Sequence, residues 1–308
     1  MHPNLLATLL ELEFSRTAVA MCCAGVAVLP IGIWAVKKEF IAAGGPDKVV
    51  ALRNLCVAVP LAVFGAEHLS AAQFIQAMVP PYMPWKLFWA YFVGFALIAA
   101  ALSIASKVRV RWSGLLFGIM MFLFVAMIHF PNALANPHDR IPTTIVFREM
   151  SFGGAGWILA GAAIDEWRGQ GKGLLITVGR VLIALAAIFF GAQHFLHPMG
   201  LPGVPLEKQM PDWVPARALI DYVTGAGLLI AGASFLLHRK TRTVATWLGA
   251  WLLLLIVLIY APVMILALLN PDTAVKVEGI NYFADTLLFA GGILAVASAS
   301  PRSAQSAS

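Results

Sequence analysis

Apolar residues along this chain gather in uncharged runs of roughly 20 residues, each long enough to cross about 30 Å of hydrocarbon as a helix. Short polar segments that carry most of the charges separate the runs. This pattern predicts an all-α integral membrane protein with about nine transmembrane helices. The predicted spans are 17–36, 49–68, 87–105, 112–130, 142–164, 174–195, 218–237, 244–269 and 282–299.

Composition supports the same class. Hydrophobic residues make up 60% of the 308 positions and charged residues 12%, with a mean hydropathy of +0.85. That balance leaves too little polar surface for a soluble globule. The cysteines, Cys22, Cys23 and Cys56, all fall in the first two predicted spans and form no C-x-x-C pair, which argues against thiol–disulfide exchange by this chain alone.

The basic residues predict the orientation. With an exofacial N-terminus and a cytoplasmic C-terminus, the inner loops and helix ends hold 14 of the 21 lysines and arginines. These are Lys37, Lys38, Lys48, Arg53, Lys107, Arg109, Arg111, Arg168, Lys172, Arg180, Arg239, Lys240, Arg242 and Arg302. The net charge of +6 therefore indicates topology and attraction to anionic lipid, with no nucleic-acid partner.

The first predicted span lacks the features of a cleaved signal peptide. Glutamates Glu11 and Glu13 precede the apolar run, and the basic pair Lys37 and Lys38 follows it, which is the reverse of a secretory signal. We therefore expect a retained N-terminal helix.

The chain also contains an internal repeat. Phe64-Gly-Ala-Glu-His-Leu69 returns as Phe190-Gly-Ala-Gln-His-Phe195, and the Pro80–Pro84 motif returns as Pro211–Pro215. Tyr91 and Gly94 match Tyr222 and Gly225, and Pro131 matches Pro262. The predicted organisation is an N-terminal helix with a basic loop (1–48), tandem four-helix bundles in parallel orientation (49–165 and 174–299) and a cytoplasmic tail (300–308).

The repeated polar residues fall at the predicted exofacial ends of the helices. Arg148, Glu149 and Asp285 lie deeper, where a charge costs about 2.5–3.5 kcal/mol and needs an interhelical partner. We expect His68, His129 or Tyr91 beside Glu149, and His194, Tyr222 or Tyr260 beside Asp285. The candidate ligand-binding or proton-handling residues are Glu67, His68, Tyr82, Tyr91, His129, Arg148, Glu149, Gln193, His194, Trp213, Asp221, Tyr222, Tyr260 and Asp285.

Structural alternatives remain for these residues. Tyr82 and Trp213, each framed by prolines, fit either a lid over a cavity or anchors in the aromatic belt. Each histidine alone fits an ordinary interfacial residue, and only the recurrence in both copies favours a site. No haem or metal spacing occurs, and Tyr260 stands where the first copy has His129, so no metal site is expected. No nucleotide-binding or hydrolase motif is present, so no catalytic residue is assigned.

The F-G-x-x-H helix end, the P-x-[YW]-[MV]-P loop and the Tyr-x-x-Gly helix start resemble the DoxX family of bacterial membrane proteins, here at double length over residues 49–299. The resemblance implies a bacterial inner-membrane location, a four-helix fold unit and a redox association. It suggests a membrane subunit that works with a redox partner and holds a quinone or small sulfur compound in an exofacial cavity. The alternative is a non-enzymatic transporter-like or lipid-binding scaffold.

Overall fold

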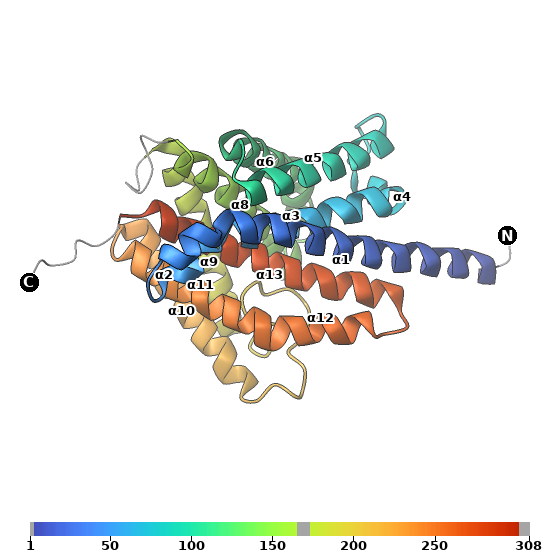
Figure 1. Cartoon of the computed structure of the whole chain (residues 1–308). Coiled ribbons are helices and arrows are strands. Elements are labelled where there is room, and N and C mark those ends of the chain that lie inside the picture. Colours follow the sequence, from blue (N-terminus) through green and yellow to red (C-terminus); the bar gives the residue numbers. More distant parts are fainter. Residues whose placement is uncertain (1–2, 165–172, 302–308) are drawn as a thin grey trace, which may run out of the picture.

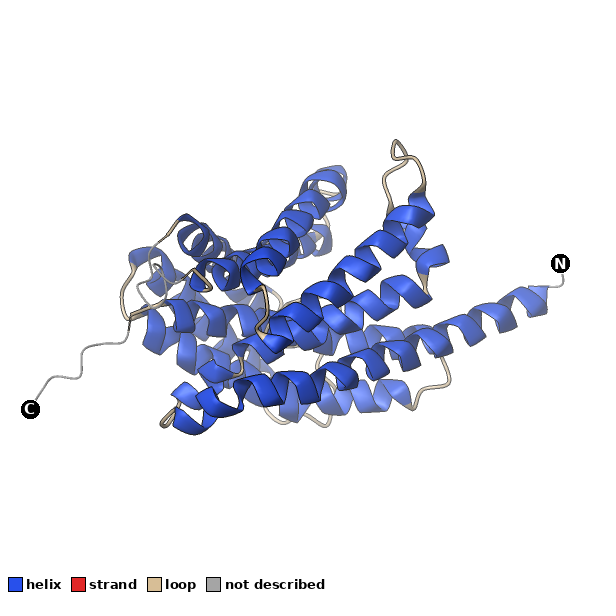
Figure 2. Cartoon of the chain, turned by 45° about the horizontal axis from the view of Figure 1, so that its top comes forward, coloured by secondary structure: helices blue, strands red, loops and turns tan. Residues whose placement is uncertain are grey.

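The computed structural model describes residues 3–164 and 173–301, with only the backbone described for residues 3–14. Helices account for most of this part of the chain, and the loops between them are short except for residues 197–216 (Figure 2). The one extended pairing among the described residues is an isolated bridge between Gly200 and Gln209. The predicted all-α class is therefore confirmed. The helices and helical turns are α1 (Pro3–Ala42), α2 (Asp47–Ala51), α3 (Arg53–Ser70), α4 (Ala72–Ile75), η1 (Gln76–Met78), α5 (Lys86–Ser106), α6 (Val110–Phe124), η2 (Val125–His129), α7 (Phe130–Ala135), α8 (Arg140–Ala162), α9 (Leu174–Leu196), α10 (Arg217–Leu237), α11 (Thr241–Leu255), η4 (Ile256–Tyr260), α12 (Ala261–Leu268) and α13 (Thr273–Ala299).

Long apolar helices make this a multi-pass membrane protein. Among the described residues, 7 helices are long and apolar enough to span a bilayer, and the bent pair of α3 with α4 and η1 raises the number to 8. The expected span 142–164 falls on α8, which does not meet the same criterion. Large apolar side chains on the outer helices, such as Phe95, Leu116 and Val257, are exposed, as a lipid-facing surface requires.

The packing joins the two halves of the chain, which we call the first half (residues 49–164) and the second half (residues 174–299). Helix α8 closes the first half but packs on α9, the opening helix of the second. In the same way α13, which closes the second half, packs on α3. Tandem four-helix bundles stay a prediction, and these contacts place the closing helix of each half against the opening helix of the other half.

Helix α1 lies along α3 and α13, and its N-terminal end projects beyond the rest of the molecule (Figure 1). It begins at Pro3 rather than near residue 17 as the apolar run predicted, because Glu11 and Glu13 do not interrupt the helical backbone. The two ends of the described chain lie at opposite ends of the molecule (Figure 1).

The two halves share backbone details as well as sequence. A π-helical turn precedes the repeated proline in each half, at η2 and η4. Left-handed residues recur 131 positions apart, and an aspartate caps the start of each closing helix, Asp139 for α8 and Asp272 for α13. The left-handed pairs are Trp85 with Ala216, Lys107 with His238, and Arg109 with Lys240. These features support the predicted duplication, while its boundaries stay a prediction; most of the expected tail, 302–308, lies outside the described residues.

The repeated glycines are helix-packing positions. A Cβ on Gly65 would lie 3.0 Å from the carbonyl oxygen of Gly94, and a Cβ on Gly191 would lie 2.9 Å from that of Gly225. The α3–α5 and α9–α10 pairs therefore approach through the same matched glycines, as small residues allow in membrane helices. This part of the repeat serves packing.

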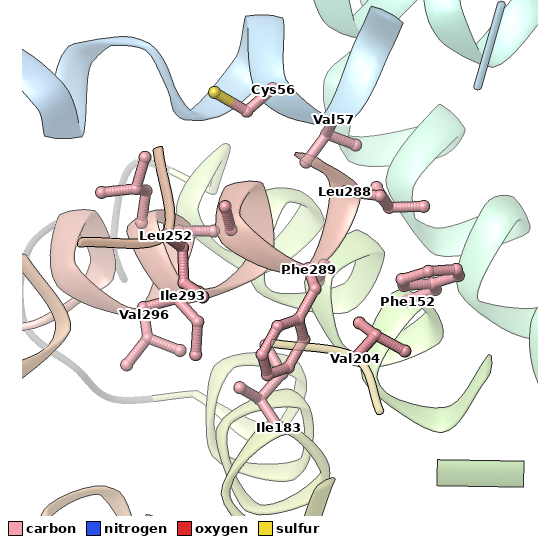
Figure 3. Close-up of a cluster of buried hydrophobic side chains, with 14 of the residues drawn as sticks. Cys56, Val57, Phe152, Ile183, Val204, Leu252, Leu288, Phe289, Ile293 and Val296 are labelled. Atoms are coloured by element: carbon pink, nitrogen blue, oxygen red, sulfur yellow. The ribbon is translucent and has the colours of Figure 1, made fainter. Parts of the chain in front are cut away.

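Helix α13 runs through the centre of the hydrophobic core (Figure 3). Its Phe289 meets Phe190 of α9 edge to face, with ring centroids 5.3 Å apart. The same cluster includes Val57 of α3, Phe152 of α8 and Val204 from the loop between α9 and α10. A loop residue thus helps to fill the interior.

Candidate functional site

A buried ion cluster joins α8 to α13. The Nη1 of Arg148 donates to Oδ2 of Asp285 at 2.8 Å, and its Nε and Nη2 donate to Oε1 of Glu149 at 3.0 and 2.7 Å. The Glu149 and Asp285 side chains are only 9% and 6% exposed, so neither carboxylate has water as its main partner. One guanidinium therefore links the two halves and pairs with two acids at once, which leaves a net negative charge when both acids are ionised.

This geometry corrects the expected partners of both acids. Glu149 was expected to need His68, His129 or Tyr91, because Arg148 starts about 100° away around the helix. The long arginine side chain instead folds back to its neighbour and still reaches α13. Asp285 was expected beside His194, Tyr222 or Tyr260, and it is Arg148 that binds it.

Glu67, at the end of α3, extends this group. The Nδ2 of Asn281 on α13 donates to Oε1 of Glu67 at 3.0 Å. The Glu67 carboxyl also lies within electrostatic range of Arg148 and Asp285. We call Glu67, Arg148, Glu149, Asn281 and Asp285 the Arg148 cluster.

Two histidines border the Arg148 cluster. His68 on α3 contacts the Phe64 carbonyl oxygen of its own helix through Nδ1, at 2.8 Å. His129 lies in η2. Both imidazoles lie within electrostatic range of Glu149. Hydrogen-bonding reach was expected, whereas the hydrogen bonds of Glu149 among the described residues come from Arg148.

A second polar group lies in the second half, between α9, α10 and η4. Nδ1 of His194 lies 2.8 Å from Oδ1 of Asp221, and both side chains are almost fully buried. The hydroxyl of Tyr260, 1% exposed, donates to the Pro202 carbonyl oxygen at 2.9 Å. The Gln193 side chain nearby is buried, and its Oε1 lacks a hydrogen-bond partner.

The loop between α9 and α10, residues 197–216, covers this second group, and we call it the plug loop. Its residues 201–205 are buried, and side chains from several helices bind its backbone. Arg140 of α8 donates to the carbonyl oxygens of Pro205 and Leu206, and the Tyr282 hydroxyl of α13 accepts from the Lys208 N–H. The corresponding segment of the first half stays at the surface, where Phe74 and Trp85 are 56% and 78% exposed.

The remaining candidates lie at the surface. Tyr82 and Trp213 are 70% and 48% exposed, so neither aromatic ring itself closes over a site. Tyr91 and Tyr222 are also exposed, and Tyr222 stacks on Phe195 with centroids 5.6 Å apart. These four aromatic residues fit anchors at a membrane interface better than a ligand site.

Residues that sequence reasoning missed complete both groups. Asn281 precedes Asp285 by four residues on α13, so both side chains lie on one helical face, a spacing that could have revealed it. Arg140 precedes the predicted span 142–164 and was not among the candidates, and neither was Gly203. Gly203 has φ +119, and a Cβ there would lie 3.3 Å from the Thr286 side chain, so the buried loop requires glycine at this point.

Comparisons with known proteins add no relative: no family model, curated protein or solved structure matches this chain. The resemblance to the DoxX family therefore stays an expectation. Within residues 3–164 and 173–301, no group of three or more His, Cys, Asp or Glu side chains is arranged to hold a metal ion.

Proposed function

We propose that the protein crosses a bacterial inner membrane nine times, with an exofacial N-terminus and a cytoplasmic C-terminus. Helix α8 is the span that raises the number from 8 to nine. Its charged residues are tolerated in the membrane because they are paired inside the bundle. The opposite positions of the chain ends fit an odd number of spans. Basic residues expected on the cytoplasmic side meet acids there, such as Arg53 and Lys107 with Glu39.

Reporter fusions test this topology. A fusion after Gln170 should give a cytoplasmic signal, and a fusion after Gln209 should give an exofacial signal. The opposite pair of signals would show that a span has been counted wrongly.

We also propose that the Arg148 cluster exchanges protons in a membrane subunit of a redox-associated complex. The observation that carries this proposal is the charge imbalance. Three carboxyl groups, on Glu67, Glu149 and Asp285, surround the single guanidinium of Arg148. Net negative charge is costly in a low-dielectric interior, so the cluster approaches neutrality by holding protons on a carboxyl group or on His68 or His129.

Glu67 is the carboxyl group best placed to exchange a proton. Arg148 binds Glu149 and Asp285 directly, whereas Glu67 receives only the neutral amide of Asn281. A quinone that accepts an electron pair also takes up a pair of protons, and Glu67 with His68 would deliver them at the end of α3. The redox partner subunit supplies the electrons in this proposal. A small sulfur compound is the other candidate ligand.

A transporter-like or lipid-binding scaffold is the second candidate function. The observation that favours it is the contact of each closing helix with the opening helix of the other half, α8 with α9 and α13 with α3. Two halves related in this way could move relative to each other around the Arg148 cluster, as repeats do in many transporters. In that case the cluster would couple a proton to the transport of a small amphipathic ligand.

The substitution Glu67→Gln tests the proton-exchange proposal. The variant should fold normally, because glutamine can still accept the hydrogen bond from Asn281. The infrared carbonyl band of protonated Glu67 should appear in the difference spectrum of native protein minus variant, in which bands from other protonated carboxyl groups cancel. Co-purified quinone, measured by mass spectrometry after mild-detergent extraction, should fall roughly tenfold, the loss expected for about 1.4 kcal/mol of binding free energy.

Glu278→Gln is the matched control, since Glu278 lies on α13 but is exposed and pairs with Lys208. It should keep both the infrared band and the bound quinone. A Glu67→Gln variant that retains the band would overturn the assignment of the proton. Retention of a co-purified lipid or other amphipath in place of quinone would favour the transporter-like function.

A further inference from the structure

One peptide group of the plug loop is bound at both of its ends. The Tyr260 hydroxyl donates to the Pro202 carbonyl oxygen at 2.9 Å, and the Gly203 N–H of the same peptide group donates to Nε2 of His194 at 3.0 Å. The peptide group is buried, so both of its polar atoms depend on these side chains. Tyr260 and His194 therefore hold the plug loop in place.

The hydrogen bond from Gly203 fixes the protonation of His194 in this conformation. An imidazole nitrogen that accepts a hydrogen bond must carry a lone pair, so Nε2 bears no proton. The ring is then neutral, with its proton on Nδ1, which faces Oδ1 of Asp221 at 2.8 Å. The Gly203 carbonyl oxygen lies 3.4 Å from the same Nε2.

The Asp221 carboxyl group is buried beside His194. Its side chain is 0% exposed, and neither carboxylate oxygen forms an aligned hydrogen bond with any described residue. An ionised carboxylate beside a neutral imidazole would leave an uncompensated buried charge. The pair becomes neutral when it takes up one proton, on Asp221 or on Nε2 of His194.

We propose that His194 and Asp221 form a second buried proton-binding site, separate from the Arg148 cluster, and that protonation of His194 releases the plug loop. An imidazolium would present an N–H to the Gly203 N–H in place of a lone pair, and the hydrogen bond would be lost. The loop backbone would have to shift so that the Gly203 carbonyl oxygen, now 3.4 Å from Nε2, accepts from the imidazolium in place of the Gly203 N–H donating. That shift draws the neighbouring Pro202 carbonyl oxygen away from Tyr260, so both ends of the clamp open together.

Other charged and titratable groups around His194 do not take the role of Asp221. The buried charged groups on α8 and α13, which pack against α9, are Arg148, Glu149 and Asp285, and the Tyr260 hydroxyl of η4 lies within electrostatic range of Asp221. Arg148 already pairs with both acids, and Tyr260 binds the plug loop. The first half has Ala90 at the position of Asp221, so only the second half carries this pair.

Cysteine accessibility tests the proposal. Val204→Cys is introduced where Cys22, Cys23 and Cys56 have been replaced by alanine, because Val204 is 1% exposed and lies in the buried part of the plug loop. The measured quantity is the rate at which a membrane-impermeant maleimide labels Val204→Cys, divided by the rate at which it labels Gln209→Cys. Gln209 is an exposed position on the same loop, so this division removes the effect of pH on thiol ionisation. This ratio should rise roughly tenfold between about pH 8 and pH 5, the range in which histidine changes charge.

The variants His194→Gln and His197→Gln complete the test. Glutamine at 194 can accept the Gly203 hydrogen bond but does not titrate, so the labelling ratio should stay low at every pH. His197 is exposed and close in sequence, and its substitution should leave the pH response unchanged. Asp221→Asn should also abolish the response, because the imidazolium would lose its counter-ion.

A pH response that persists in His194→Gln would overturn the proposal, as would a ratio that stays low across the whole pH range in the parent protein. Hydrogen exchange of residues 199–210, corrected for the intrinsic effect of pH and measured with Val204 intact, gives an independent reading. At low pH these residues should exchange faster in the native protein than in His194→Gln. Equal exchange in the two proteins at low pH would contradict the proposed release.

Discussion

Replacing Arg148 by glutamine is expected to lower the free energy of unfolding by about 3–5 kcal/mol, the cost of leaving buried ion partners without their counter-charge. Arg148 is the direct positive partner of both Glu149 and Asp285, whose side chains are 9% and 6% exposed. Glutamine cannot neutralise either acid, and the contact between α8 and α13 would become repulsive. Thermal unfolding in mild detergent, followed by circular dichroism, measures the loss.

Two comparisons separate this electrostatic effect from a general loss of packing. Arg111→Gln, at an exposed position of α6, should change stability by less than about 0.5 kcal/mol. The triple variant Arg148→Gln, Glu149→Gln, Asp285→Asn should recover much of the lost stability, because it removes the unpaired charges together with the arginine. A triple variant no more stable than Arg148→Gln alone would contradict the charge-bridge explanation.

The helices were predictable from sequence because the bilayer sets their length. Each apolar run had to form a helix to satisfy its own backbone, so the runs at 87–105 and 174–195 correspond closely to α5 and α9. Helix ends outside the apolar runs were not predictable, as the early start of α1 at Pro3 shows. Hydropathy reports where a helix meets lipid and carries no information about where its backbone stops.

The partners of the buried charges were less predictable. Hydropathy shows that Arg148 and Asp285 must face the interior, but it cannot show that residues 137 positions apart belong to touching helices. The duplication suggested that each half would be complete in itself, and this placed the expected partners of Asp285 in the second half. The contact of α8 with α13 across the two halves created the pairing that the repeat pattern concealed.

The plug loop was missed for a different reason. The proline-framed motif at 211–215 suggested either a lid over a cavity or an aromatic anchor, but it did not indicate that the preceding residues 201–205 are buried. The plug-loop residues Leu201, Val204 and Met210 are nearly fully buried, whereas the shorter first-half segment has exposed Phe74 and Met78. Apolar residues spaced closely in the longer loop were the available signal, and they explain why the two halves differ at this end.

Gly179→Ala is expected to destabilise the protein by about 1–3 kcal/mol through overpacking. Helices α8 and α9 meet at Gly154 and Gly179, where the backbones of the two halves come together. A Cβ on Gly179 would lie 2.4 Å from the Gly154 carbonyl oxygen, and a Cβ on Gly154 would lie 2.8 Å from that of Gly179. Because the obstacle is backbone, a rotamer change cannot relieve it, and the two helices must separate.

Gly227→Ala in α10 provides the matched control. Its added methyl group would meet only a Leu248 side-chain atom at 3.6 Å, which is ordinary van der Waals contact. Alanine favours a helix over glycine by about 1 kcal/mol, so this variant should unfold at the same temperature or slightly higher. The same methyl group therefore has opposite expected effects at the two positions, and the difference isolates the close approach of the helices. Equal unfolding temperatures for the two variants would show that the contact between α8 and α9 does not depend on glycine.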